Sequence, residues 1–322
     1  MKLIRISRLA VPLAVGALLL SACGGNNNTD TANASGDGGG SLSGAVKIDG
    51  SSTVAPLSTA AAELFKEEAP GVNVTVGTSG TGGGFEKFCA GETDISDASR
   101  PIDEADEVPL CEEAGIEFAE IPVANDALTV VVNAENDWVD CLTTEQLKAI
   151  WEPGSKVSSW KDVDSSFPDE KLELFGPGTD SGTFDYFTDE INGEEGASRT
   201  DYEPSEDDNI IVQGVSGDPN ALGYFGFTYF EENADSLKAL EVDSGEGCVA
   251  PSVETARDGS YTPLSRPLFI YPAKSALDKP QVKAFLDFYL ANDADIAEAA
   301  QYIPLSDEQK SEAKSTFDAF AG

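Results

Sequence analysis

The sequence of 322 residues contains no histidine and only 20 lysines and arginines, against 58 aspartates and glutamates. Without histidine, the chain cannot build a Ser-His-Asp or Cys-His nucleophile system, or a metal site that uses imidazole. The formal net charge of −38 argues against a nucleic-acid partner, because phosphate backbones attract basic surfaces. Composition therefore excludes several common classes of enzyme and of nucleic-acid-binding protein.

Long apolar runs are also scarce, and the clearest one lies at the N-terminus. Three basic residues precede an apolar stretch over residues 9–20, which is too short to span a bilayer. The tetrapeptide Leu-Ser-Ala-Cys that ends at Cys23 is typical of a bacterial lipoprotein cleavage site. We expect residues 1–22 to be a lipoprotein signal peptide and Cys23 to become the lipidated, palmitate-carrying N-terminus. The alternative is an ordinary signal peptide followed by a chance cysteine.

The residues after Cys23 are mostly glycine, asparagine, serine and threonine up to about residue 44. Such a segment cannot bury apolar surface, so residues 23–44 are expected to form a flexible linker. The sequence thus predicts a globular protein that is lipid-anchored at the outer face of the cell membrane.

Four cysteines remain beyond the linker. An even number of cysteines in an oxidising compartment predicts two disulfides, although three pairings are open and four buried thiols are the alternative. These cysteines are Cys89, Cys111, Cys141 and Cys248.

Hydrophobic periodicity predicts an α/β fold with a mostly parallel sheet. Residues 45–89 contain the order strand, Gly/Ser/Thr turn and helix twice. Further on, the pattern predicts strands and helices in alternation. The later strands are expected at residues 127–132, 172–175 and 268–271, and the later helices at 144–151, 184–191 and 282–290.

Three turns share one design, in which a strand end is followed by glycine, serine and threonine and then by a helix start. They cover residues 50–53, 78–84 and 178–183. Helix N-termini present free backbone N–H groups and a partial positive charge, and glycine lets the backbone approach a ligand. Three such turns in one α/β chain indicate an oxyanion site, with three unrelated helix caps as the alternative. A nucleotide P-loop is excluded, because no lysine follows Gly82 or Gly182.

Several stretches carry a resemblance that covers residues 46 to about 305. They are GSSTVAPL, TSGTGGGFEKF, DISDASRPI, LTTEQLKAIW, SSWKDV, DSGTF, NALGYFGFTYF and SRPLFIY. Together they resemble the Pst-type phosphate-binding proteins of bacterial high-affinity phosphate ABC transporters, within the periplasmic-binding-protein family.

The resemblance implies a two-lobed, type II periplasmic-binding-protein clamshell in which each lobe is a mixed sheet flanked by helices. Lobe I is expected at residues 45–123 plus 262–322, and lobe II at 124–261. The implied function is to bind inorganic phosphate and deliver it to the permease and ATPase subunits of an ABC transporter. No cofactor, metal or catalytic residue is implied. The alternatives are a receptor for sulfate or another oxyanion, an extracellular phosphatase, and an adhesin with the same fold.

Carried over residue by residue, the resemblance places phosphate ligands on the three turns and on the segment after the second helix. Relatives have an arginine just before the third turn, which residues 176–179 lack, so Arg100 is expected to supply the cation. Asp180 is the candidate acceptor for the phosphate proton, with Asp94 and Asp97 as alternatives, although each carboxylate could be a cap or turn residue. The full set is Ser52, Thr53, Ser79, Gly80, Thr81, Ser99, Arg100, Asp180, Ser181, Gly182 and Thr183.

The implied lobes also suggest which cysteines pair. Cys89 and Cys111 fall in lobe I, and Cys141 and Cys248 fall in lobe II. A bridge between lobes would tether the hinge, so the pairs Cys89–Cys111 and Cys141–Cys248 are predicted.

Overall fold

The structure is a computed structural model that describes residues 42–322. The predicted signal peptide, Cys23 and most of the predicted linker lie outside the described residues. Strand β1 (Ser43–Gly50) begins two residues before the strand expected from the sequence. Within residues 42–322, no helix is both long enough and apolar enough to cross a membrane.

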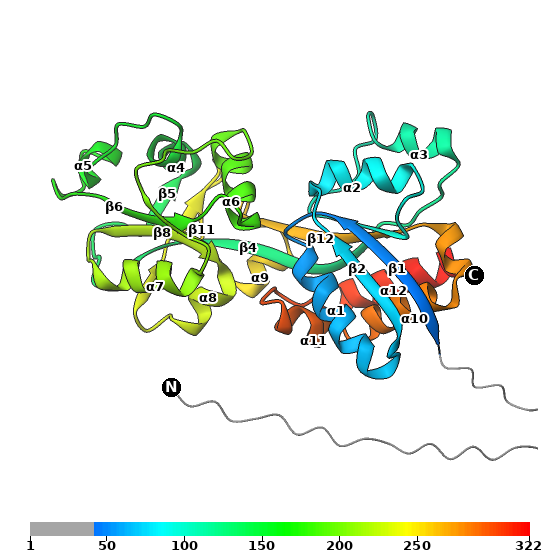
Figure 1. Cartoon of the computed structure of the whole chain (residues 1–322). Helices are drawn as coiled ribbons and strands as arrows, with labels where there is room; N and C mark the ends of the chain where they lie inside the picture. Colours follow the sequence, from blue (N-terminus) through cyan, green and yellow to red (C-terminus); the bar gives the residue numbers. More distant parts are fainter. Residues whose placement is uncertain (1–41) are drawn as a thin grey trace, which may run out of the picture. The chain divides into compact units, whose positions relative to one another are not determined.

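Strands and helices alternate along the described chain, as the sequence predicts (Figure 1). The strands after β1 are β2 (Gly71–Gly77), β3 (Ile95–Ala98), β4 (Ile121–Asn133), β5 (Cys141–Thr143), β6 (Glu173–Pro177), β7 (Glu203–Ser205), β8 (Ala221–Gly226), β9 (Leu237–Ala239), β10 (Glu241–Asp243), β11 (Cys248–Val249) and β12 (Ser265–Pro272). The helices are α1 (Ala55–Glu68), α2 (Gly80–Cys89), α3 (Val108–Ala114), α4 (Thr144–Trp151), α5 (Trp160–Val163), α6 (Gly182–Phe187), α7 (Asp208–Gly217), α8 (Phe227–Glu232), α9 (Val253–Arg257), α10 (Pro280–Ala291), α11 (Asp293–Ala299) and α12 (Asp307–Ala321). A π-helical turn, η1 (Thr188–Asn192), extends α6, and a 3-10 turn, η2 (Lys274–Asp278), precedes α10.

One hydrogen-bonded sheet runs through most of the fold, in the order β2-β1-β3-β12-β4-β8-β6-β7, with β9 also paired to β4. Strand β4 has 13 residues and is buried along almost its whole length. Its first part pairs with β12, and its second part pairs with β8 and β9. The strands β4 and β12 therefore connect two halves of the sheet (Figure 1).

Separate hydrophobic cores lie on either side of the segments 125–127 and 265–267. The first core draws its buried residues from 46–124 and 268–317, where α1, α2, α10 and α12 cover the sheet. The second half, residues 128–264, carries one cluster around Trp151 and Trp160 and another around Val131 and Phe225. We call residues 42–124 and 268–322 the first half, and residues 128–264 the second half. The lobe limits expected from the resemblance stay a prediction.

The expected elements are found, and the mixed sheet that the resemblance implies is confirmed, whereas the mostly parallel sheet expected from periodicity is wrong. Strands β1, β2 and β3 are parallel in the first half, and β6, β7 and β8 are parallel in the second. Every pair that contains β4 or β12 in this sheet is antiparallel. The chain crosses between the halves once in each direction, so the two crossing strands run opposite to each other and make the sheet mixed.

Both predicted disulfides are confirmed. Cys89 pairs with Cys111, which links α2 to α3 in the first half. Cys141 pairs with Cys248, which links β5 to β11 at the edges of a small sheet in the second half. Each bridge therefore stays within one half.

The two bridges should differ in their contributions to stability. They close loops with sequence separations of 22 and 107 residues. In the chain-entropy account, the shorter loop contributes about 3 kcal/mol and the longer about 5 kcal/mol to the free energy of unfolding. Urea unfolding of the double variants Cys89→Ser/Cys111→Ser and Cys141→Ser/Cys248→Ser should show the larger loss in the second. A larger loss in the first would show that loop entropy does not govern stability here.

Candidate functional site

A cavity of about 490 Å³ lies between the two halves. Its walls combine hydroxyl and glycine residues of the first half with acidic residues of the second half, and two arginines contribute to it. The lining residues are Ser51, Ser52, Thr53, Ser79, Gly80, Thr81, Gly82, Gly83, Ser99, Arg100, Pro101, Asp185, Tyr186, Asp189, Glu190, Glu195, Arg266 and Pro267. The first two predicted turns and the segment after β3 therefore meet at one place.

The first turn is held tightly against the sheet. Gly50 has a φ of +147°, a left-handed conformation that glycine adopts freely, and a side chain there would overlap the backbone of Asp97. The amide of Ser51 donates to the carbonyl oxygen of Asp97 at 2.9 Å, and helix α1 starts at Ala55. Ser51 and Thr53 are almost fully buried. This packing fixes Ser52 and Thr53 at the cavity wall.

In the second turn, the two candidate hydroxyls differ in their contacts. The amide and hydroxyl of Ser79 both donate to Asp49, whose other oxygen accepts from Lys87 at 2.7 Å. Partial burial acts to raise the pKa of Asp49, but the bonds from Lys87 and Ser79 lower it overall, so the carboxylate stays ionised and holds the hydroxyl of Ser79. The hydroxyl of Thr81 lies 3.1 Å from that of Ser99. One of these two hydroxyls can donate to the other, which leaves one O–H for a ligand.

Arg100 lines the cavity as expected, but its guanidinium is already paired with a carboxylate. Its Nη1 and Nη2 donate to the two oxygens of Glu107, both at 2.8 Å, and Nη1 also donates to the carbonyl oxygen of Pro101. The guanidinium is about half exposed. Arg100 therefore lies at the rim of the cavity with its charge largely compensated.

A second cation, Arg266, was missed in the sequence reasoning. It precedes the apolar part of β12, and its guanidinium stacks on the ring of Tyr186 with 3.4 Å from Cζ to the ring centroid. Its Nη2 lies 3.3 Å from Oγ1 of Thr53, and its Nε lies 3.4 Å from the buried carboxylate of Asp126. Within residues 42–322, Nη1 of Arg266 has no hydrogen-bond acceptor. Arg266 thus contacts both halves and keeps a donor for the cavity.

The third predicted turn faces the first turn rather than the wall of this cavity. A Cβ at Gly182 would lie 2.7 Å from Oγ1 of Thr53, so only glycine permits this approach. The hydroxyl of Ser181 caps α6 by accepting from the amide of Thr183, and Thr183 lines a separate, smaller cavity. Asp180 lines neither cavity, and its amide points to Glu206.

The alternative acceptors Asp94 and Asp97 also lie away from the cavity. Asp94 accepts from Lys279 at 2.6 Å and from the amide of Lys47. Asp97 is fully buried and accepts from the hydroxyl of Ser58, and burial raises its pKa to about 8. Both carboxyl groups have structural roles inside the first half. The assignment of ligand residues from the resemblance stays a prediction.

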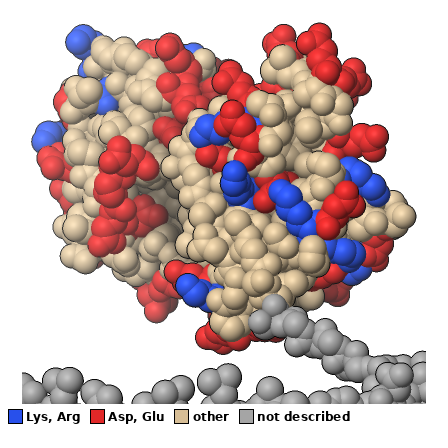
Figure 2. Space-filling model, turned by 45° about the vertical axis from the view of Figure 1, so that its right-hand side comes forward, with Lys and Arg blue, Asp and Glu red and all other residues tan. Residues whose placement is uncertain are grey.

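Four carboxyl groups of the second half face the hydroxyl turns, namely those of Asp185, Asp189, Glu190 and Glu195. Burial and Glu195 raise the pKa of Asp185 to about 6, although Arg266 acts to lower it. Burial and Asp189 raise the pKa of Glu190, again against Arg266. This wall was not expected for an anion site. It agrees with the composition of the chain, and with the face drawn in Figure 2, where acidic side chains are more frequent than basic ones.

Comparison with known proteins identifies the family of the chain. Residues 31–293 match the PBP superfamily domain. The chain belongs to the PBP superfamily. It is 47% identical over 317 residues to the protein SphX of Synechocystis, which covers 98% of this chain and 90% of that protein. It is 41% identical to the phosphate-binding protein PstS of Staphylococcus saprophyticus, over 96% of this chain and 93% of the relative.

Solved structures give the same result. A crystal structure named as a possible phosphate binding protein from Planctomyces limnophilus is 46% identical and has a TM-score of 0.83. It covers 87% of this chain and 99% of its own. The phosphate transport receptor of Vibrio cholerae is 24% identical with a TM-score of 0.63, which shows a shared fold. Membership of the PstS-like group and the α/β binding-protein fold are therefore confirmed.

Of the two cavity arginines, Arg266 should matter more to anion binding. Arg266→Gln removes a partly buried cation and should weaken phosphate binding by about 100-fold, or about 3 kcal/mol. Arg100→Gln should cost about tenfold or less, because Glu107 already compensates that charge. Titration calorimetry with phosphate measures the affinity of both variants, and thermal unfolding shows whether each variant is folded. A larger loss in Arg100→Gln would reverse the assignment.

Proposed function

We propose that this protein binds inorganic phosphate outside the cytoplasmic membrane and delivers it to the permease and ATPase subunits of an ABC transporter. In this proposal, residues 45–123 and 262–322 form one lobe, residues 124–261 form the other, and the cavity between them is the phosphate site. The membrane attachment through Cys23 belongs to the same proposal. The relative named phosphate-binding protein PstS supports the ligand, and the resemblance to the Pst-type proteins of phosphate ABC transporters supports the transport role.

The observation that carries the proposal is the convergence of hydroxyls and glycine backbone from the first half with a cation, Arg266, from the crossing strand β12. Thr53 supplies one hydroxyl, the hydrogen-bonded pair of Thr81 and Ser99 supplies a second, and Arg266 supplies a charge-assisted donor beside Thr53. Tetrahedral oxyanions need many donors at short range, and this wall provides them without a metal. With four acidic residues opposite, a ligand that can donate a hydrogen bond of its own fits better than one that cannot.

Titration calorimetry with the purified protein tests the ligand. Phosphate should bind one-to-one, arsenate should bind similarly because it has the same shape and protonation, and sulfate should bind at least 100-fold more weakly at pH 8. Equal affinity for sulfate would favour the alternative of a general oxyanion receptor. No binding of any oxyanion would refute the proposal. A chromogenic phosphate-ester assay on the same sample separates the phosphatase alternative, since a binding protein should release no product.

We propose that Asp185, rather than Asp180, accepts the hydrogen bond from the protonated oxygen of phosphate. Asp185 lines the cavity, and its pKa is raised to about 6 by burial and Glu195. Above pH 6 its carboxylate can accept from phosphate and repels sulfate, which has no proton to share. Below pH 6 the neutral carboxyl group can donate to a sulfate oxygen instead.

Sulfate affinity should therefore rise about tenfold or more as the pH falls from 8 to 5. The variant Asp185→Asn should lose most of this pH dependence. It keeps the neighbouring charged residues, which are Arg266, Asp189, Glu190 and Glu195. Asp180→Asn is the matched control and should keep the pH dependence. Sulfate binding with the same pH dependence in Asp185→Asn as in the wild type would assign the titration to another group.

A further inference from the structure

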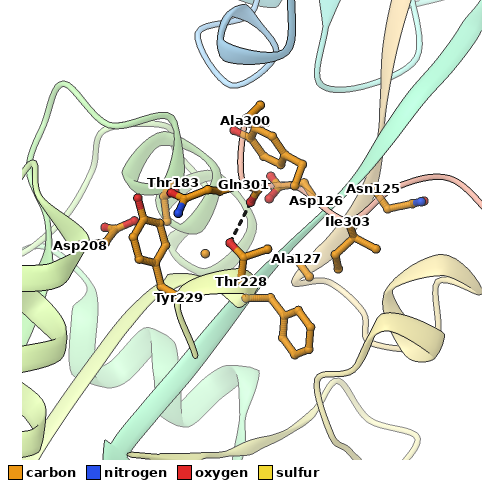
Figure 3. Close-up of a pocket in the computed structure, with 13 residues that line it drawn as sticks. Asn125, Asp126, Ala127, Thr183, Asp208, Thr228, Tyr229, Ala300, Gln301 and Ile303 are labelled. Carbon is orange, nitrogen blue, oxygen red and sulfur yellow. Dashed lines mark hydrogen bonds between the residues drawn. The ribbon is translucent and has the colours of Figure 1, made fainter. Parts of the chain in front are cut away.

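Residues 301–304, between α11 and α12, touch both halves of the protein, and we call them the strap. The strap borders a cavity of about 160 Å³ that is separate from the proposed phosphate site. Figure 3 shows this cavity, with Gln301 and Ile303 on one side and Thr183, Asp208 and Tyr229 on the other. The lining residues come from β4, from the second half, and from the strap together with the preceding Ala300.

The strap is attached to the second half by three contacts. The hydroxyl of Thr228, in α8, donates to the carbonyl oxygen of Gln301 at 2.8 Å, as the dashed line in Figure 3 marks. The Nε and Nη2 atoms of Arg257, in α9, donate to the carbonyl oxygen of Pro304 at 2.9 and 2.8 Å. Ile303 is buried in a small cluster with Ala127, Phe227 and Ala256.

The same strap is attached to the first turn of the cavity wall. The hydroxyl of Tyr302 donates to the carbonyl oxygen of Thr53 at 2.8 Å, and the Tyr302 ring packs against the first core. Between these ends, Ile303 and Asn125 exchange two backbone hydrogen bonds of 2.8 and 3.0 Å. The strap thus joins the ligand-facing turn, the crossing strand β4 and the second half within four residues.

The strap begins as the C-terminal cap of α11. Gln301 has a φ of +60°, and within residues 42–322 it is the one non-glycine residue with a positive φ. Its amide donates to the carbonyl oxygen of Glu298, and the amide of Tyr302 donates to that of Ala297 at 2.8 Å, a pair of bonds that commonly ends a helix with one left-handed residue. The helix end therefore fixes the backbone between the bond from Thr228 to Gln301 and the bond from Tyr302 to Thr53.

We propose that the strap is a third connection between the two halves, non-covalent and beside the covalent crossings in β4 and β12. In this role, Tyr302 and Thr228 are positioning residues for the turn that contains Thr53. The link to phosphate affinity rests on the proposed function. Gly182 of the second half touches Thr53, so a hinge motion that separates them must also strain the Thr228 or Tyr302 bond. The strap therefore couples the position of the second half to the geometry of the ligand-facing turn.

The first test needs no ligand. Hydrogen exchange of the amides of residues 51–55 should become several-fold faster in Tyr302→Phe, and also in Thr228→Val, although Thr228 does not touch that turn. In the double variant these amides should exchange no faster than in the more affected single variant, because both substitutions break the same connection between the second half and the turn. Tyr224→Phe and Thr129→Val are matched controls, since each removes a buried hydroxyl with no hydrogen-bond partner among residues 42–322. Unchanged exchange in Thr228→Val would overturn the proposal.

The second test is phosphate titration of the same variants. Each single variant should bind phosphate about tenfold more weakly, with a non-additive double variant and with melting temperatures of the ligand-free proteins close to that of the wild type. A purely structural role would instead lower the melting temperature and leave affinity within twofold, which would contradict a positioning role. If the wild type binds no phosphate, the proposed function fails, and the exchange experiment alone decides whether the strap transmits hinge position.

Discussion

The guanidinium of Arg266 is the contact on which the arrangement of the cavity depends. It stacks on Tyr186 from the second half, contacts Thr53 from the first, and pairs with Asp126 on the crossing strand β4. Burial raises the pKa of Asp126, although Arg266 acts to lower it, so removing the arginine would leave a carboxyl group without its partner. In a chain with 58 acidic and 20 basic residues, one cation held by three neighbours can draw an anion into an otherwise acidic cavity.

The arrangement of the cavity also requires that backbone segments approach each other closely, and glycine permits this approach at the points of contact. A Cβ at Gly182 would meet Thr53, and a Cβ at Gly84 would lie 2.5 Å from the Cα of Gly50. The start of α2 therefore lies at the wall of the cavity, and the start of α6 packs directly against Thr53. The acidic wall of Asp185 and its neighbours limits what this volume accepts, because every carboxylate there disfavours an anion that carries no proton.

The sequence predicts the elements of this fold well and its long-range contacts poorly. Helix α4 spans residues 144–151, as its periodicity predicts, because the signal is local. Periodicity alone favoured a mostly parallel sheet, and the mixed sheet followed only from the resemblance, since strand direction depends on the crossings of β4 and β12. Arg266 lies 213 residues from Thr53 and 140 from Asp126, so no spacing rule connects them. Its one local signal was a rare basic residue at the start of a predicted strand. Asp185 was not among the acceptor candidates from the sequence, which were Asp180, Asp94 and Asp97, because periodicity does not tell which face of a short helix meets a cavity.

The most direct test of the account is a crystal structure of the protein with bound phosphate. The account predicts one phosphate in the cavity between the halves, with oxygens about 3 Å from a guanidinium nitrogen of Arg266 and from the hydroxyl or amide groups of Thr53 and the second turn. A phosphate bound at Arg100 without contact to Arg266, or bound outside this cavity, would contradict it.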